Sequence, residues 1–150
     1  MRRRTLGELL EDARAKIERL APGQAFTAAR NGALIIDIRS EVNRDHHGTV
    51  AGSVHIPRTV LEWRLSPDSA WRNPHLGAPD RQLIILCDHG YSSSLAAATL
   101  VDLGLDATDV IGGFEAWIKE GLPATAPTNP RASKEFPGMG RPEPLDHDLL

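Results

Sequence analysis

The chain has only one cysteine among its 150 residues, so it cannot form an internal disulfide. A reducing compartment is compatible with that composition, because disulfide frameworks belong to oxidising ones. No apolar run approaches the roughly 20 residues that cross a bilayer, and the first residues lack the apolar core of a secretory signal. These absences predict a cytoplasmic protein without a membrane partner.

Excess positive charge is also missing, since the formal net charge is −3. General nucleic-acid binders carry a basic surface, so we expect no nucleic-acid partner. The hydrophobic content of 41% and the charged content of 25% are those of an ordinary globular protein. At this length, one domain with a sizeable core is expected.

Helical and extended patterns alternate along the chain, which predicts an α/β fold with a mainly parallel central sheet flanked by helices on both faces. A capping box of Thr5 and Glu8 precedes apolar residues on one helical face, from Leu6 to Leu20. The run 33–38 is apolar on both faces, as in a parallel strand covered by helices. Further strands are expected at 53–56, 83–87 and 109–111, and helices at 23–30, 95–103 and after Gly113.

Proline dominates the chain beyond Leu122, at positions 123, 127, 130, 137, 142 and 144. Little periodicity accompanies it, which predicts a C-terminal tail that is either disordered or laid over the domain surface. Phe136 and Met139 are candidates for an apolar anchor. The predicted organisation is an N-terminal helix over 1–22, an α/β domain over 23–123 and a Pro-rich tail over 124–150.

The single cysteine, Cys87, stands where the apolar run 83–86 changes to the short loop 88–94. A cysteine that ends a buried strand is often an inert apolar side chain. The glycine and hydroxyl residues that follow favour a nucleophile instead, because amide groups of such a loop and of the first helical turn converge on the sulfur and stabilise an anion there. Helix N-termini lower a cysteine pKa from about 8.5 into the range of roughly 3.5–7.5.

Several other polar residues should lie near Cys87. In an open α/β sheet, ligands bind outside the carboxyl ends of the strands. Asp37, Arg39 and the turn Gly112-Gly113 are expected at the same edge as Cys87. We expect Asp37 and Arg39 to form an ion pair that fixes the strand ends, with a direct functional role as the alternative.

Four segments, in this order, resemble a single-domain rhodanese over residues 24–123. They are Asp37 to Arg39, His47 to Pro57, Cys87 to Ser93 and Gly112 to Trp117. The resemblance implies the rhodanese α/β fold and a cysteine that forms a persulfide. Cys87 would attack the outer sulfur of a donor such as thiosulfate, hold it as Cys–S–SH, and pass it to an acceptor such as cyanide or a thiol.

The loop after Cys87 is the predicted cradle for the persulfide, and it needs neither a metal nor another cofactor. Its members are Asp88, His89, Gly90, Tyr91, Ser92 and Ser93. We expect the loop amides and the Ser92 and Ser93 hydroxyls to donate hydrogen bonds to the bound sulfur. Gly90 should supply a backbone angle that other residues resist, and His89 should either orient the donor or brace the loop.

Asp88 departs from the family pattern, since many rhodaneses carry a cation inside this loop. A carboxylate beside the cysteine disfavours the thiolate and repels an anionic donor, although the effect is small if the carboxylate points to solvent. Candidates for the missing positive charge are Arg44, Arg58 and Arg64, each of which also fits an ordinary surface arginine.

Two other chemistries fit the residues poorly. A cysteine phosphatase of a related fold needs an arginine about six residues after the cysteine to clamp phosphate, and no arginine occurs between Arg81 and Arg131. The spacing of the candidate metal ligands fits no standard zinc pattern. Those candidates are His46, His47, His55 and His89.

A non-catalytic role stays open beside the enzyme. The domain could carry a persulfide to a protein with a reactive thiol, or sense sulfur, with the tail or the side chains of Trp63 and Trp71 as the contact. Tryptophans more often cover a core than form such contacts. Turnover with small donors separates the two roles, because a pure carrier would release sulfur only to its partner.

Overall fold

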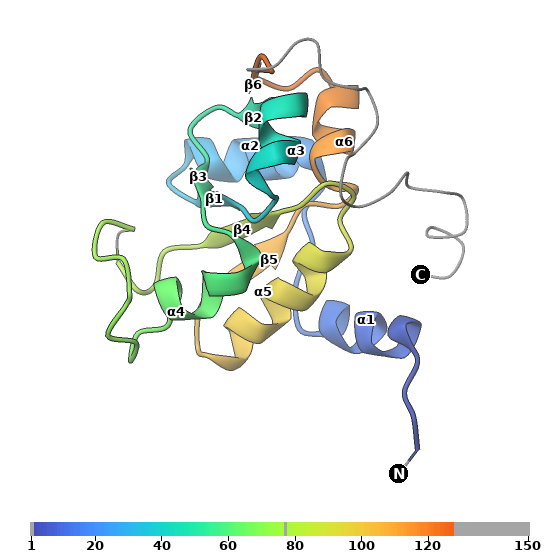
Figure 1. Cartoon of the computed structure of the whole chain (residues 1–150), viewed down its shortest axis with the longest axis vertical. Coiled ribbons are helices and arrows are strands. Elements are labelled where there is room, and N and C mark those ends of the chain that lie inside the picture. The colour runs from blue at the N-terminus through green and yellow to red at the C-terminus, as the bar shows by residue number, and fades with distance from the viewer. Residues whose placement is uncertain (1, 77, 128–150) are drawn as a thin grey trace.

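Helices and strands alternate along residues 2–76 and 78–127, which are the part of the chain that the computed structural model describes (Figure 1). The elements are α1 (Leu6–Ala15), α2 (Pro22–Arg30), β1 (Leu34–Asp37), α3 (Glu41–His47), β2 (Thr49–Val50), β3 (Val54–His55), the 3-10 helix η1 (Arg58–Val60), α4 (Leu61–Leu65), β4 (Leu83–Leu86), α5 (Ser92–Asp102), β5 (Ala107–Asp109), α6 (Gly113–Lys119) and β6 (Ala124–Thr125). Phe136 and Met139 of the predicted tail lie outside the described residues.

Four parallel strands form the main sheet, in the order β3-β1-β4-β5. Ile36 of β1 lies opposite Val54 of β3 and Ile85 of β4, and Ile85 in turn lies opposite Asp109 of β5. The predicted α/β fold with a mainly parallel sheet is therefore confirmed. Because all four strands run the same way, their carboxyl ends share one edge, and Cys87 follows the inner strand β4 at that edge.

Both faces of the sheet are covered, with α2 and α6 on one side and α4 and α5 on the other (Figure 1). Every residue of β1 and β4 is buried, since alternate side chains enter opposite cores. Ile36 and Ile85 pack with α4 and α5, while Ile35 and Ile84 pack with α2 and α6. Burying each such side chain contributes about 1.5–3 kcal/mol, so the strand before Cys87 is held from both sides.

The N-terminal segment begins as predicted but leaves the helix early. Thr5 accepts a hydrogen bond from the Glu8 backbone N–H at 3.0 Å, which confirms the capping box. The expected helix to residue 22 is wrong, because α1 ends at Ala15 and Leu20 instead forms a parallel bridge with Val110 beside β5. The α1 helix packs on α5, the helix that follows the cysteine loop (Figure 1).

Further differences concern strand limits and the two tryptophans. The last strand of the main sheet is β5, Ala107–Asp109, where the sequence predicted residues 109–111. The first residues of the predicted tail form β6, which pairs antiparallel with β2. Trp63 and Trp71 are 57% and 70% exposed, so they do not cover the core. Among the helices described, none is long and apolar enough to cross a membrane.

Candidate active site

Cys87 is buried directly after β4, with 6% of its surface exposed. Its Sγ accepts hydrogen bonds from the backbone N–H of Gly90 at 3.2 Å and of Ser93 at 3.4 Å. Ser93 belongs to the first turn of α5, so the loop and the helix start both direct amides at the sulfur. The two amides lie where the sequence analysis expected them, and N–H groups in this position can stabilise an anion.

Gly90 has the left-handed backbone that the sequence predicted, with a φ of 83°. A Cβ at this position would lie 2.7 Å from the Gly112 nitrogen and 3.0 Å from the Val110 oxygen. Both the angle and the lack of space therefore require glycine. Its neighbours Tyr91 and Ser92 are partly buried and exposed, respectively, where the loop enters α5.

The Ser93 hydroxyl is directed away from the sulfur, contrary to the prediction. It donates to Asp109 Oδ2 at 2.8 Å, and the Ser94 hydroxyl donates to the same oxygen at 2.7 Å. A hydroxyl donates one hydrogen bond, and the acceptor of this one is the fully buried Asp109 carboxylate. Asp109 also accepts from Arg19 Nε at 2.8 Å. Asp109 therefore connects the start of α5 to the N-terminal segment. From the sequence it was expected only as part of a strand.

Asp37 and Arg39 form the expected ion pair. Arg39 Nε and Nη2 donate to the two Asp37 oxygens at 3.0 and 2.8 Å, and both side chains are buried. The Arg39 guanidinium also lies 4.1 Å from the centre of the Phe114 ring. The pair therefore connects the end of β1 to α6.

Asp88 is buried, which makes the solvent-facing alternative wrong. Asn43 Nδ2 of α3 donates to its carboxylate at 2.8 Å, and Arg39 Nη1 lies 3.7 Å away. Burial raises the pKa of Asp88, while Arg39 and Asn43 act in the opposite direction. The carboxylate is thus partnered by Asn43 of α3 and by Arg39, two residues after β1, both outside the cysteine loop.

None of the three arginines predicted to supply positive charge is placed to do so. Arg44 pairs with Asp37 at 3.2 Å. Arg58 pairs with Glu62, and Arg64 donates to the Trp71 carbonyl at 2.9 Å. Each of these side chains binds a residue within seven positions of it in the sequence, and none binds the cysteine loop through these contacts.

Two other arginines, which the sequence analysis missed, contact the loop from the N-terminal segment. Arg14 Nη2 and Arg19 Nη2 donate to the Gly90 carbonyl at 2.8 and 2.9 Å. Arg14 Nε also donates to the Ser94 hydroxyl at 3.1 Å. Both precede the segment that resembles a known family. One sequence signal could have pointed to Arg14: it follows Ala13, one of the apolar residues on the face of the helix that packs against the domain.

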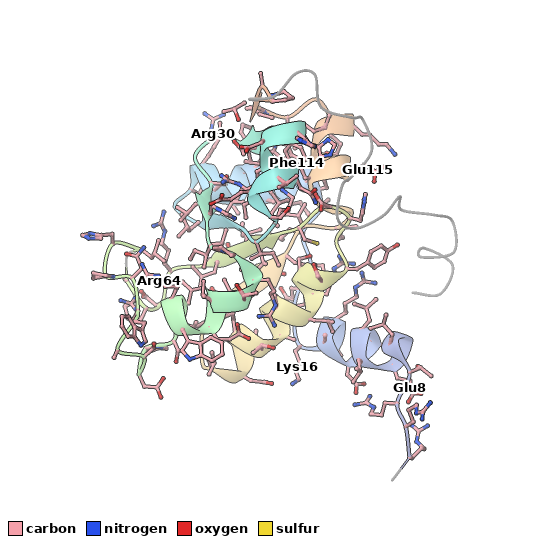
Figure 2. The ribbon with its side chains drawn as sticks, in the orientation of Figure 1. Glu8, Lys16, Arg30, Arg64, Phe114 and Glu115 are labelled. Carbon is pink, nitrogen blue, oxygen red and sulfur yellow. The ribbon has the colours of Figure 1, made fainter. Side chains whose placement is uncertain are left out.

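The start of α6, which carries Phe114 and Glu115 (Figure 2), also holds the loop. The backbone N–H of Phe114 donates to the Cys87 carbonyl at 2.8 Å, and that of Glu115 donates to the Asp88 carbonyl at 3.1 Å. His89 Nδ1 lies 2.7 Å from Glu115 Oε2. Of the two predicted roles for His89, the geometry matches the loop brace.

Gly113 makes this contact possible, and Gly113→Ala tests it. Its φ is 63°, and a Cβ would lie 2.5 Å from the Cys87 oxygen and 2.7 Å from the His89 nitrogen. Backbone strain and overpacking together should lower the free energy of unfolding by about 2–4 kcal/mol, measured by urea denaturation. Gly121→Ala is the matched control, since Gly121 has a φ of 70° and no atom within 4 Å of the added carbon. Equal losses in the two variants would contradict the contact.

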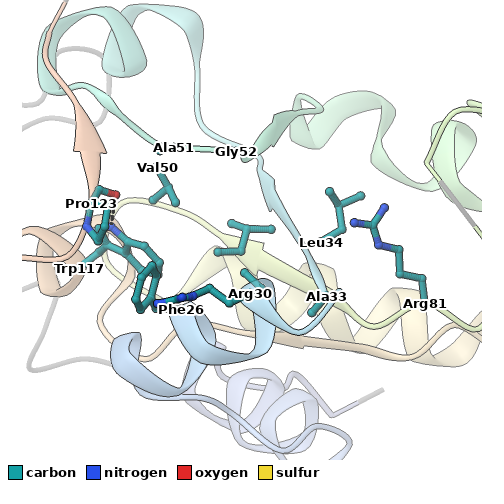
Figure 3. A pocket seen from close by; sticks show the side chains of 12 residues that line it. Phe26, Arg30, Ala33, Leu34, Val50, Ala51, Gly52, Arg81, Trp117 and Pro123 are labelled. Atoms are coloured by element: carbon teal, nitrogen blue, oxygen red, sulfur yellow. Dashed lines mark hydrogen bonds between the residues drawn. The ribbon is translucent and has the colours of Figure 1, made fainter.

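A pocket of about 260 Å³ lies elsewhere in the fold (Figure 3). Apolar side chains such as Phe26, Leu34 and Trp117 line it, together with Arg30 and Arg81. It reaches the amino end of β1, whereas Cys87 lies at the carboxyl edge of the sheet, and its lining residues include no nucleophile. Within residues 2–76 and 78–127, no cluster of three or more His, Cys, Asp or Glu side chains could hold a metal ion. The cysteine loop, with its buried thiol and two amides directed at the sulfur, is the candidate site of reaction.

The fold and the loop together define a class of protein. It is an α/β domain in which a cysteine at the carboxyl edge of a parallel sheet lies inside a cradle of backbone N–H groups, an arrangement suited to covalent chemistry at sulfur. Residues 24–120 match the family model of the Rhodanese-like domain, and the chain belongs to this family. The predicted family is confirmed.

Two relatives agree with this assignment, and a solved structure shares the fold. The thiosulfate sulfurtransferase GlpE of Pseudomonas paraeruginosa is 36% identical over 102 residues, which are 67% of this chain and 83% of that protein. GlpE of Pseudomonas fluorescens is 34% identical over 118 residues, 77% of this chain and 98% of that protein. A protein of unknown function from Rhodopseudomonas palustris, described as a possible tyrosine phosphatase, superposes with a TM-score of 0.75 at 30% identity over 83% of this chain and 97% of its own.

Proposed function

We propose that the protein moves a sulfane sulfur from an anionic donor such as thiosulfate to cyanide or a thiol, through a persulfide on Cys87. The observation that carries the proposal is the pair of amide hydrogen bonds from Gly90 and Ser93 to Sγ. Amides in this position stabilise negative charge on sulfur, both in the thiolate and in the persulfide anion. The relatives named thiosulfate sulfurtransferase support the choice of donor.

The transfer takes two displacements at sulfur. In the first, the Cys87 thiolate attacks the outer sulfur of thiosulfate, the sulfur–sulfur bond of the donor breaks, and sulfite leaves with the bonding electrons. In the second, cyanide attacks the terminal sulfur of the persulfide, the new sulfur–sulfur bond breaks, and thiocyanate leaves while the thiolate is restored. A covalent intermediate thereby divides one difficult transfer into two easier steps, and no oxidant or reductant is consumed.

Phosphate transfer is disfavoured by the residue at the clamping position. Ser93 stands six residues after Cys87, where a phosphatase needs arginine, and its hydroxyl is bound to Asp109. Arg14 and Arg19 approach the back of the loop and donate to a backbone carbonyl there. Without a bidentate clamp inside the loop, a tetrahedral phosphate lacks its main partner.

Intact-protein mass spectrometry tests the proposal. Incubation with excess thiosulfate should add about 32 Da, one sulfur atom bound as the covalent intermediate, and cyanide should then remove it with release of thiocyanate. No gain with thiosulfate or with polysulfide would contradict the proposal. Sulfur that is gained but not released to cyanide or small thiols would identify a carrier that acts with a protein partner. That partner and the cytoplasmic location stay predictions.

A further inference from the structure

We propose that Arg14, which precedes the family-matching residues, is the cation of the cysteine loop and selects for anionic sulfur donors. The inference rests on the proposed function, because it concerns the donor that Cys87 attacks. Arg14 would act through its charge on the thiol and on the approaching donor, which makes it a specificity-determining residue outside the loop itself.

Arg14 is joined to the thiol through one residue of the loop. Its Nη2 donates to the Gly90 carbonyl at 2.8 Å, and the N–H of that same Gly90 donates to Cys87 Sγ at 3.2 Å. Its guanidinium carbon lies 5.6 Å from the centre of the Tyr91 ring. The charge is therefore held against the same short loop that binds the sulfur.

The charge of Arg14 is not neutralised by an ion pair. Arg19 binds the same Gly90 carbonyl, but its guanidinium also forms an ion pair with Asp109 at 2.8 Å. Arg14 contacts a hydroxyl and a carbonyl, and within residues 2–76 and 78–127 it forms no ion pair with a carboxylate. Partial burial lowers the pKa of Arg14, yet a guanidinium stays protonated at neutral pH.

The other charges behind the loop are matched with one another. Asp109 pairs with Arg19, and Asp37 with Arg39 and Arg44. Asp88 is partnered by Arg39 and Asn43. Arg14 itself makes no direct ion pair with these carboxylates, and both the Asp109 carboxylate and the Cys87 sulfur act on it electrostatically.

Replacing Arg14 should change the charge and spare the loop. Arg19 still holds the Gly90 carbonyl, and the start of α6 still holds the Cys87 carbonyl. Arg14→Gln removes the positive charge, while Arg14→Lys keeps it. Lys16→Gln is the matched control, because Lys16 lies one residue beyond α1, pairs with Asp102 at 2.9 Å and also carries one positive charge (Figure 2).

The first measurement compares alkylation of Cys87 by iodoacetate, an anion, and by iodoacetamide, which is neutral. The ratio of the two rates should fall about fivefold in Arg14→Gln at low salt, since a nearby charge acts at an effective dielectric constant near 20. The ratio should be unchanged in Arg14→Lys and Lys16→Gln, and the effect should shrink as salt screens the charge. Equal slowing with both reagents would show a purely structural role and overturn the proposal.

The second measurement is the steady-state rate with thiosulfate. Arg14→Gln should lower kcat/KM about tenfold, mainly through a higher KM, and Arg14→Lys should restore most of it. An unchanged KM in Arg14→Gln would overturn the proposal. Alkylation needs only a reactive thiol, so a protein that transfers no sulfur would refute the proposed function while the reagent ratio still tests the role of Arg14.

Discussion

Cys87→Ser is expected to lower sulfur transfer from thiosulfate to cyanide by at least about 10³-fold, the scale on which loss of a covalent nucleophile acts. A serine oxygen cannot form a persulfide, and its hydroxyl is a weak nucleophile at neutral pH. The replacement should fold normally, because serine has nearly the volume of cysteine and its oxygen can accept the Gly90 and Ser93 amide bonds. Thiocyanate formation measures the loss, and urea denaturation measures the fold.

Cys87→Ala provides the control for that experiment. It should lose activity equally, and it should also lose stability, because the two amides are left without a partner in a buried place. A serine variant that keeps more than a tenth of the activity would show that another group carries the sulfur, and the persulfide mechanism would be wrong.

Asp109→Ala should cause the largest loss of stability, about 3–5 kcal/mol, because it removes one partner of a buried ion pair. Asp109 is fully buried and accepts from Ser93, Ser94 and Arg19. Its loss removes the acceptor of the buried Ser93 hydroxyl, the shorter of the two hydrogen bonds of Ser94, and the ion-pair partner of Arg19. Sulfur transfer should fall as well, because Asp109 holds the side chain of Ser93, and the backbone N–H of Ser93 donates a hydrogen bond to the Cys87 sulfur.

Asp102→Ala is the matched control, since Asp102 lies on α5 and pairs with Lys16. Its side chain is 61% exposed, so its removal should cost less than about 1 kcal/mol. Urea denaturation at pH 7 compares the two variants. If Asp109→Ala loses no more stability than Asp102→Ala, then the Asp109 cluster does not support the loop in the way described.

Patterns within short stretches of the sequence predicted the fold well. The apolar run of β1 forms a strand buried on both faces, since a parallel strand between helices has no polar side. The Thr5 and Glu8 pair caps α1, because its hydrogen bonds are local. The place of Cys87 between β4 and α5 also follows from the change of pattern at that point.

The contacts that complete the site join residues far apart in the chain, and no short pattern encodes them. Arg14 and Gly90 are 76 positions apart, and Arg19 and Asp109 are 90 apart. Asp88 is partnered from α3, 45 positions away. A contact between distant residues also explains why Leu20 is not helical, because it forms a parallel bridge with Val110. The sequence of the loop 88–93 therefore did not predict that Arg14 and Arg19 contact it.

The bridge between Leu20 and Val110 also closes an open border of the sheet. β5 is the last strand on that side, and the Leu20 N–H and C=O bond to Asp109 and Ile111 at 3.1 and 2.8 Å. Unpaired strand borders invite pairing with other molecules and aggregation. A chain shortened to residues 24–120 would expose that border and lose Arg14 and Arg19, so we expect it to be less soluble and less active than the full chain.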